Sequence, residues 1–306
     1  MKLKKFTQLV VCFFLMCPVT LAAEKQPKVL LINSDAAVEK YQVTQEEFKR
    51  AFSHPVLEIN LNDRKWGINQ VEEFLYDEYP DLVYCIGSKA YLVANKYISK
   101  KPIVFSSIIN WQRLPVTQKT YGVSNELPAE MHMTIFRFIF PKIQKIGIVY
   151  SERYNSQWFN KTMEEARKMG VSIIGQTVSK NKDFLPALKQ LLPNVDALWL
   201  ISDPVIMSDK TILMEVFKKC DAHKVPVFTY QDVFTEYGAV LTVSVDDATI
   251  GRQAADITRE ILSAGMIEKQ VQYPAGSHII LNLKKVKEYA FPYNQDALGI
   301  VNQIIE

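Results

Sequence analysis

Polar residues gather where predicted strands end, in both halves of the chain. Gly87-Ser88 is the most specific of these sites, because glycine allows close approach of a ligand. Ser88 begins a predicted helix whose free N–H groups favour an anion such as a carboxylate, although a plain helix N-cap is an equal alternative. Asp203 and Asp232 could each hold a ligand ammonium group, or could instead only cap the helix that follows.

Ligands of open parallel sheets bind outside the carboxyl ends of the strands, so these loops predict a small-molecule site. Tyrosines in the same loops could sandwich an apolar or aromatic group, as could Trp111, although any one of them alone more often serves packing. The candidate ligand-binding residues are Asn33, Ser34, Asp35, Gly87, Ser88, Ser106, Ser107, Ser124, Tyr150, Ser151, Tyr154, Asn155, Ser202, Asp203, Tyr230 and Asp232.

Catalytic and cofactor motifs are missing from the sequence. It contains no G-x-G-x-x-G, no P-loop and no G-x-S-x-G elbow. The histidines are scattered without metal-ligand spacing, at His54, His132, His223 and His278. A two-lobed racemase would need a thiol at matching places in both halves, but the position that matches Cys85 is Leu200. The sequence therefore predicts a binding protein without a cofactor or a metal, and not an enzyme.

The elements that position these loops form a pattern that occurs twice. Each copy has short apolar runs that end in small polar residues, in the same order and at nearly the same spacing. Three pairs of segments match, namely 28–35 with 145–152, 80–88 with 195–203, and 101–105 with 224–228. Two homologous lobes are the simplest explanation.

Near-continuous apolar strands separated by helices indicate parallel sheets that are covered on both faces. The predicted strands are 28–32, 56–61, 81–86, 102–106, 145–150, 171–178, 196–201 and 226–229. The predicted helices are 44–52, 68–78, 88–99, 127–140, 155–169, 183–192, 208–223 and 247–263. The predicted fold class is α/β, with two similar Rossmann-like lobes whose parallel sheets are joined by a multi-strand hinge.

The hinge is predicted from a stretch that recurs. Residues 121–126 and 241–247 each contain Val-Ser just before a helix, so Val123, Ser124, Val243 and Ser244 are the candidate hinge residues. A third crossing is predicted through 271–274. The first lobe is therefore expected to comprise 27–123 plus 245–270, and the second 124–244 plus 271–306.

The N-terminus, residues 1–23, has the composition of a signal peptide. A basic start with three lysines precedes an apolar run from Leu9 to Cys17, then Pro18 and a group of small residues up to Ala23. The apolar run is too short for a mature membrane anchor. We expect an exported, periplasmic protein that is not inserted in a membrane after cleavage.

Composition narrows the range of partners. Removing residues 1–23 lowers the count of Lys and Arg from 36 to 33, which equals the 33 Asp and Glu, so the net charge of +3 belongs to the signal. No basic field remains to attract nucleic acid. Cys85 and Cys220 remain, one in each lobe, and are expected to be buried small hydrophobes without a disulfide between them.

Several motifs carry a resemblance to a known family. They are Pro80-Asp81-Leu82-Val83 before Gly87-Ser88-Lys89-Ala90, then Gly122-Val123-Ser124, Gly251-Arg252-Gln253-Ala254-Ala255 and Ile279-Ile280-Leu281-Asn282-Leu283-Lys284. With these, the chain resembles the substrate-binding proteins of ABC transporters with type I periplasmic-binding fold, in the branch that includes tryptophan- and tyrosine-type binders. The resemblance implies two lobes that close on a small ligand and deliver it to a permease with a cytoplasmic ATPase.

The departures from the family pattern lie in the loops of the predicted site. Where the family has Asp-Pro after the fourth strand, this chain has Ser106-Ser107-Ile108-Ile109. Tyr150-Ser151-Glu152 replaces Tyr-Asn-Pro, and Asp203-Pro204 replaces Asp-Asn. The scaffold motifs are thus kept while the ligand loops differ.

The predicted function is a monomeric periplasmic solute-binding protein of an ABC importer. Its ligand would be an amino acid, with aromatic ones among the options, or a related small carboxylate. One alternative is a periplasmic sensor module that reports to a signalling receptor. An exported isomerase or hydrolase is a further alternative, but no set of acid, base and nucleophile can be assembled for it.

Overall fold

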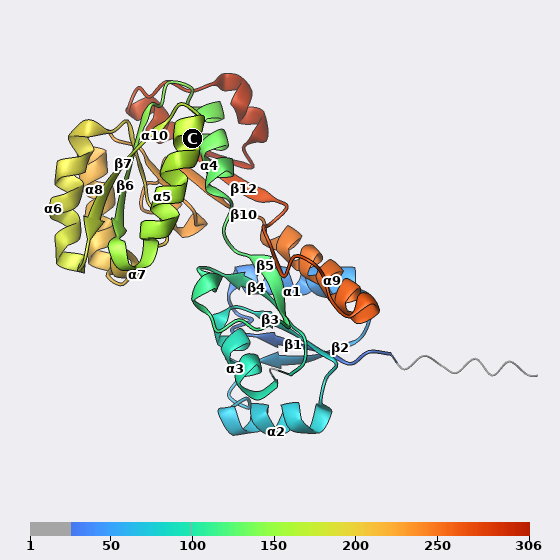
Figure 1. Cartoon of the computed structure of the whole chain (residues 1–306). Coiled ribbons are helices and arrows are strands. Elements are labelled where there is room, and N and C mark those ends of the chain that lie inside the picture. The colour runs from blue at the N-terminus through green and yellow to red at the C-terminus, as the bar shows by residue number, and fades with distance from the viewer. Residues whose placement is uncertain (1–25, 99) are drawn as a thin grey trace, which may run out of the picture.

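The computed structural model describes residues 26–98 and 100–306, so the predicted signal peptide at 1–23 lies outside the described residues. Two α/β lobes lie next to one another, and the chain passes between them more than once (Figure 1). This arrangement confirms the predicted fold class.

The first lobe is built on a six-stranded sheet in the order β11-β5-β4-β3-β1-β2, in which all neighbours are parallel. Its strands are β1 (Val29–Asn33), β2 (Val56–Asn60), β3 (Leu82–Ile86), β4 (Ile103–Ile108), β5 (Thr120–Ser124) and β11 (Val271–Gln272). Every residue of β1, β3 and β4 is buried, as expected for strands covered on both faces.

Two helices cover each face of this sheet. On one face, α1 (Glu39–Phe52) and α9 (Asp247–Ala264) bury Phe48, Phe52 and Ile250 against the strands. On the other face, α2 (Ile68–Glu78) and α3 (Ser88–Ile98) bury Leu75 and Tyr91. The helix predicted at 44–52 begins earlier in the structure, at Glu39. The prediction missed its first turn because that turn is mostly polar and carries no apolar periodicity.

The second lobe is built on a seven-stranded sheet in the order β13-β12-β10-β9-β8-β6-β7. Its strands are β6 (Lys145–Ser151), β7 (Ser172–Val178), β8 (Ala197–Trp199), β9 (Val227–Thr229), β10 (Leu241–Val245), β12 (Ser277–Asn282) and β13 (Gln303–Ile305). The β10–β12 pair is antiparallel and the other pairs are parallel.

Helices again cover both faces of the sheet. One core cluster joins the sheet to α4 (Ala129–Ile139), α5 (Glu152–Lys168) and α10 (Leu283–Glu288), and another joins it to α6 (Phe184–Leu191) and α8 (Lys210–Ala222). The helix predicted at 208–223 is α8, preceded by a separate short helix, α7 (Pro204–Met207). Cys85 and Cys220 are both free and buried.

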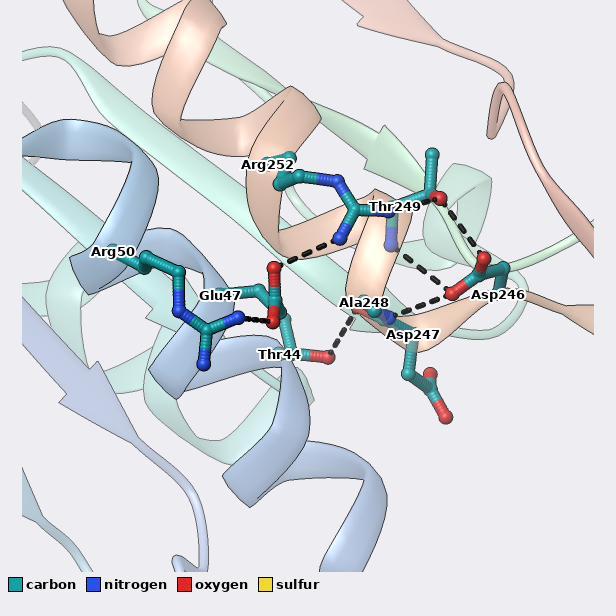
Figure 2. A network of polar contacts seen from close by, with 8 residues as sticks. All are labelled: Thr44, Glu47, Arg50, Asp246, Asp247, Ala248, Thr249 and Arg252. Carbon is teal, nitrogen blue, oxygen red and sulfur yellow. Dashed lines mark hydrogen bonds and ion pairs between the residues drawn. The ribbon is translucent and has the colours of Figure 1, made fainter.

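The seam between α1 and α9 attaches a late part of the chain to the first lobe (Figure 2). A Cβ on Gly251 would lie 2.4 Å from the backbone oxygen of Thr44, so only glycine lets the two helices approach this closely. Glu47 forms ion pairs with Arg50 and with Arg252, the latter at 2.8 Å. The close approach and the Glu47–Arg252 ion pair hold α9 on α1.

Three segments cross between the lobes, and they lie at 125–128, 245–246 and 273–276. Val245 packs against the cores of both lobes. The Asp246 N–H donates to the Gly276 oxygen at 3.3 Å, which ties two of the crossings together.

The strands predicted to form the hinge lead into these crossings. Val123 and Ser124 are in β5 of the first sheet, and Val243 and Ser244 are in β10 of the second. Val271–Gln272 pairs with Gly122 and Val123 in the first sheet, whereas the predicted boundary put residue 271 in the second lobe. Backbone pairing with β5 holds this short strand in the first sheet, so the third crossing follows it.

Candidate ligand-binding site

The carboxyl edges of the two sheets meet at their loops. Asn110, in the loop after β4, donates from Nδ2 to Ser202 Oγ of the second lobe at 3.1 Å. The guanidinium of Arg113 lies 5.0 Å from the centroid of the Tyr154 ring, also across the lobes. Loops predicted from the sequence as ligand contacts therefore face one another across the two lobes.

Gly87 lies in close contact with its neighbours at the first-lobe edge. Its φ is +84°, and a Cβ there would lie 2.6 Å from Ser34 Oγ and 3.1 Å from Tyr41 Cζ. Ser34 Oγ accepts a hydrogen bond from the Ala90 N–H at 3.0 Å, so Ser34 performs the capping predicted for Ser88. Ser88 is exposed at the first position of α3.

Asn33 and Asp35 hold the loop between β1 and α1. The buried Asn33 side chain donates to Gln45 Oε1 at 2.7 Å and accepts from the Asp35 N–H at 3.0 Å. Asp35 Oδ1 accepts from the Ala37 N–H at 3.0 Å and from Asn62 Nδ2 at 3.1 Å. These contacts fix the start of α1, which carries Tyr41.

Ser106, Ser107 and Ser124 differ in what they contact. The Ser106 hydroxyl is fully buried and lies 2.7 Å from the Tyr84 hydroxyl, inside the core. Ser107 lies where the register of β4 shifts and has a φ of +58°, a conformation that costs about 1 kcal/mol or more outside glycine. Ser124 Oγ accepts from the Glu126 N–H at 3.1 Å and closes the turn after β5.

Asp203 anchors the second-lobe edge. It is completely buried, and its Oδ2 accepts from the Ser151 N–H at 2.7 Å, from Ser151 Oγ at 2.6 Å and from Asn155 Nδ2 at 2.6 Å. Its Oδ1 caps α7 by accepting from the N–H groups of Val205 at 2.9 Å and Ile206 at 3.4 Å. Five donors fill the lone pairs of this carboxylate, so no acceptor remains for a ligand ammonium. Of the two roles predicted for Asp203, the structure shows helix capping.

The three tyrosines predicted for the site have different environments. Tyr150 stacks on Phe159 in the core, with the ring centroids 4.2 Å apart. Tyr154 is 41% exposed beside Arg113. Burial raises the pKa of Tyr230 to about 12, an effect partly offset by a hydrogen bond with Ser202. Tyr154 and Tyr230 therefore border the facing loops, while Tyr150 belongs to the core.

Asp232 is an exposed carboxylate of the second lobe, in the short 3-10 helix Asp232–Thr235. Its Oδ1 accepts a hydrogen bond from Ser244 Oγ at 2.7 Å, which links it to the strand that leads to the second crossing. It also lies close enough to Asp247 of the first lobe to raise the pKa of that carboxyl.

Asp247, the first residue of α9, was not among the predicted site residues. Its neighbour Asp246 caps the helix, since Oδ1 accepts from the N–H groups of Ala248 at 2.9 Å and Thr249 at 3.1 Å. The Asp247 backbone oxygen accepts from Thr44 Oγ1 at 3.2 Å, but its own Oδ1 is buried without a hydrogen-bond partner among the described residues (Figure 2). Burial raises the pKa of Asp247 to about 7.

Tyr41 stands beside this carboxylate, between Asp247 and Gly87. Burial raises the pKa of Tyr41, and the charges of Asp247 and Asp35 raise it further. The end of its ring lies against Gly87, because a Cβ added to that glycine would come within 3.1 Å of Cζ. A carboxylate, an aromatic hydroxyl and a glycine backbone thus come together at the first-lobe edge.

Glu126, Asn110 and Arg113 form a second polar group that no sequence pattern predicted. Burial raises the pKa of Glu126, while a hydrogen bond from the Asn110 backbone and the charge of Arg113 lower it. These residues lie in loops without periodicity, so no sequence signal marks them. The sequence does mark Asp247, because it follows a second aspartate at the start of a helix. Only one of two successive aspartates can be the N-cap, so the other is free for a different role.

Residues 26–98 and 100–306 contain no group of three or more His, Cys, Asp or Glu side chains that could hold a metal ion. In the same part of the chain, no helix is long and apolar enough to cross a membrane.

The fold agrees with comparisons to known proteins. Residues 60–304 match the family model described as ABC transporter substrate binding protein, and the chain belongs to that family. A curated relative is the tyrosine-binding protein of Clostridioides difficile strain R20291, which is 20% identical over 210 residues. That match covers 66% of this chain and 60% of the relative's length.

Solved structures share the fold at low sequence identity. The ligand-free, open structure of a substrate binding protein with adhesive properties from Clostridium difficile has a TM-score of 0.70 and 16% identity, covering 90% of this chain and 98% of that one. A Streptococcus pneumonia ABC domain in complex with L-Trp has a TM-score of 0.59 and 16% identity, covering 91% and 100%. A conserved domain protein from Vibrio cholerae has a TM-score of 0.61 and 19% identity, covering 92% and 100%.

Proposed function

We propose that this protein is the periplasmic solute-binding component of an ABC importer and that it captures an amino acid or a related small carboxylate between its two lobes. Family membership supports the first part of the proposal. The names of two relatives, a tyrosine-binding protein and a domain in complex with L-Trp, support an amino acid and include aromatic ones.

The contact between the two sheet edges carries this proposal. The Asn110–Ser202 hydrogen bond of 3.1 Å brings loops of both lobes within reach of one another. A small molecule between them would touch both lobes, and a ligand selects the closed form only to the extent that it does so. The short crossing segments allow bending between the lobes, and the closed form is what a permease with its cytoplasmic ATPase would recognise.

We propose binding without turnover, by a monomer. The best-placed serine, Ser151, donates its hydroxyl to Asp203, which is also held by four other hydrogen bonds. His132 packs between Phe136 and Trp199 inside the second lobe, where burial lowers its pKa to about 4. Neither arrangement gives a base that is free to activate a nucleophile near the facing loops.

Isothermal titration of the chain from residue 24 tests the proposal. The titrants are the standard L-amino acids and their deaminated counterparts, which are small carboxylates such as indole-3-propionate. We expect one or a few to bind, and small-angle X-ray scattering should show a smaller radius of gyration in their presence. If none of these compounds binds, the proposed function is wrong.

Variants at both edges test whether the ligand touches both lobes. Gly87→Ala in the first lobe and Tyr230→Ala in the second should each lower the affinity about tenfold or more, through a blocked approach and a lost contact respectively. Gly299→Ala is the control, because a Cβ at Gly299 meets nothing within 4 Å. A loss of affinity confined to one lobe would contradict capture between the two.

A further inference from the structure

Asp247 Oδ1 is a buried oxygen without a partner. Within the described residues 26–98 and 100–306, buried side-chain atoms of this kind occur at Asn95, Asn125, His132 and Asp247, and only the last belongs to a carboxylate. A buried polar group without a hydrogen bond costs about 1–3 kcal/mol, and more when it is charged. The fold therefore keeps a costly carboxylate that its own side chains do not satisfy.

The surroundings of Asp247 carry more negative than positive groups. The Lys40 ammonium is the strongest single charge that acts on it, and Asp232, Asp246 and Glu39 act on it as like charges. Asp232 belongs to the second lobe. Glu39 and Lys40 are in the first turn of α1, and Asp246 directly precedes α9. Three carboxylates and one ammonium around Asp247 leave a negative field that draws on both lobes.

The position of Asp247 also fits ligand contact. Its backbone is fixed by Thr44, so the start of α9 does not move away from α1. Tyr41 stands next to it, and the Lys40 ammonium lies 5.1 Å from the centroid of the Tyr41 ring, which shows that this ring face already accepts a cation. Gly87, against the end of the ring, leaves room that any side chain would fill.

We propose that Asp247 is the residue that recognises a primary ammonium group of the ligand, with Tyr41 forming the wall beside it and Asp232 adding negative charge from the second lobe. The inference deepens the proposed function and rests on it, because it assigns the ligand to the primary amines and names the residue that selects them. A ligand ammonium supplies the hydrogen-bond donor that Oδ1 lacks. An amide in place of the carboxylate keeps the shape and loses the charge.

Isothermal titration with matched pairs of compounds tests this assignment. Each L-amino acid that binds is compared with its deaminated counterpart, for example L-tryptophan with indole-3-propionate and L-tyrosine with 3-(4-hydroxyphenyl)propionate. We expect the deaminated compound to bind the native protein at least about 100-fold more weakly, since it leaves the Asp247 carboxylate unpaired. In Asp247→Asn, the preference should shrink to about tenfold or less, mainly through weaker binding of the amino acid.

Glu260→Gln provides the control, because it makes the same chemical change at an exposed residue near the other end of α9 and should alter affinity by no more than about twofold. Asp247→Ser serves as a second variant if the asparagine protein does not fold. The melting temperature without ligand separates lost recognition from lost folding, since removing the unpaired charge should not lower it.

Each outcome decides between the two proposals. If deaminated carboxylates bind as tightly as the amino acids, the ammonium assignment is wrong and the solute-binding function stands. The assignment is also wrong if Asp247→Asn keeps the full preference of the native protein. If no compound of either set binds, both proposals are overturned together.

Discussion

Each lobe has an aspartate at the carboxyl edge of its sheet and near the start of a helix, Asp203 in the second lobe and Asp247 in the first. Asp203 is fully buried and accepts five hydrogen bonds from the protein. Asp247 has a buried oxygen that accepts none from the part of the chain that the structure describes. The two residues look alike in sequence, and the number of protein donors around each separates a structural carboxylate from one that is available to a ligand.

Removing the carboxylate of Asp203 should have the largest effect on stability. Asp203→Ala leaves buried donors of Ser151 and Asn155 unpaired and uncaps α7, so we expect the free energy of unfolding to fall by about 3 kcal/mol or more. Urea unfolding measures this loss of the free energy of unfolding. Asp232→Asn, at an exposed carboxylate, should change it by about 0.5 kcal/mol or less. Similar values for the two variants would contradict the structural role of Asp203.

Separating α9 from α1 should destabilise the first lobe, which carries Asp247, without affecting the surroundings of Asp203. In Gly251→Ala the new Cβ meets the Thr44 backbone oxygen, and the resulting shift should lower the free energy of unfolding by about 2 kcal/mol, despite the better helix propensity of alanine. Chemical denaturation of this variant and of Gly299→Ala gives the comparison. An unchanged stability would show that the seam can widen without cost.

Removing the charge of Asp247 should stabilise the ligand-free protein. Because its pKa is about 7 in the folded state, above the ordinary 3.8, stability that is fully present below pH 4 is lost as the pH rises through 7. Asp247→Asn should therefore raise the free energy of unfolding at pH 8 by about 1 to 2 kcal/mol, allowing for solvent screening, and by less at pH 5. A variant that is less stable than the native protein at pH 8 would contradict this sign.

The affinity for an ammonium compound should depend on pH through the same carboxyl. Protonation of Asp247 removes the charge that the ligand ammonium contacts, so affinity should fall about tenfold between pH 8 and pH 6. Glu39, Lys40 and Tyr41 of α1, Tyr84 of β3, Asp246 and Asp232 are the charged or titratable groups that act around it. Titration calorimetry of Asp247→Asn over the same range should give a nearly flat profile.

The contact between the lobes should have the smallest effect. Asn110→Ala removes the partly buried hydrogen bond to Ser202, worth about 1 kcal/mol or less, and should shift the ligand-free protein toward a more open form. A small increase in the radius of gyration measures this change. Ser202→Ala also removes the hydrogen bond with Tyr230, so the double variant should open no further than Ser202→Ala alone, and a larger opening would mean that the two side chains act separately.

The fold could be predicted because its signals are local. β3 (Leu82–Ile86) is a continuous apolar run, and α9 has a stripe that includes Ile250, Ala254 and Ile257. β11 (Val271–Gln272) is too short to carry a pattern, and only its backbone pairing with β5 places it in the first sheet.

The site was predictable only in outline. Strand ends indicated loops of both lobes, and two of these loops meet at Asn110 and Ser202. The sequence does not show that Ser34 caps α3 from another loop, or that Ser106 bonds within the core. The state of Asp203 depends on donors that lie 48 or 52 residues away, whereas the buried oxygen of Asp247 has no donor. Such pairings are properties of the tertiary structure.

Asp247 follows the crossing at Val245–Asp246 directly, and Val245 packs against both cores. Points close to a rotation axis travel least when a body swings, so this carboxylate would keep its place while Ser202 and Tyr154, farther along the second-lobe edge, sweep through a longer arc. In the capture that we propose, the charged end of the solute would be held at the pivot from first encounter onward. Its remaining atoms would then be enclosed by the moving rim.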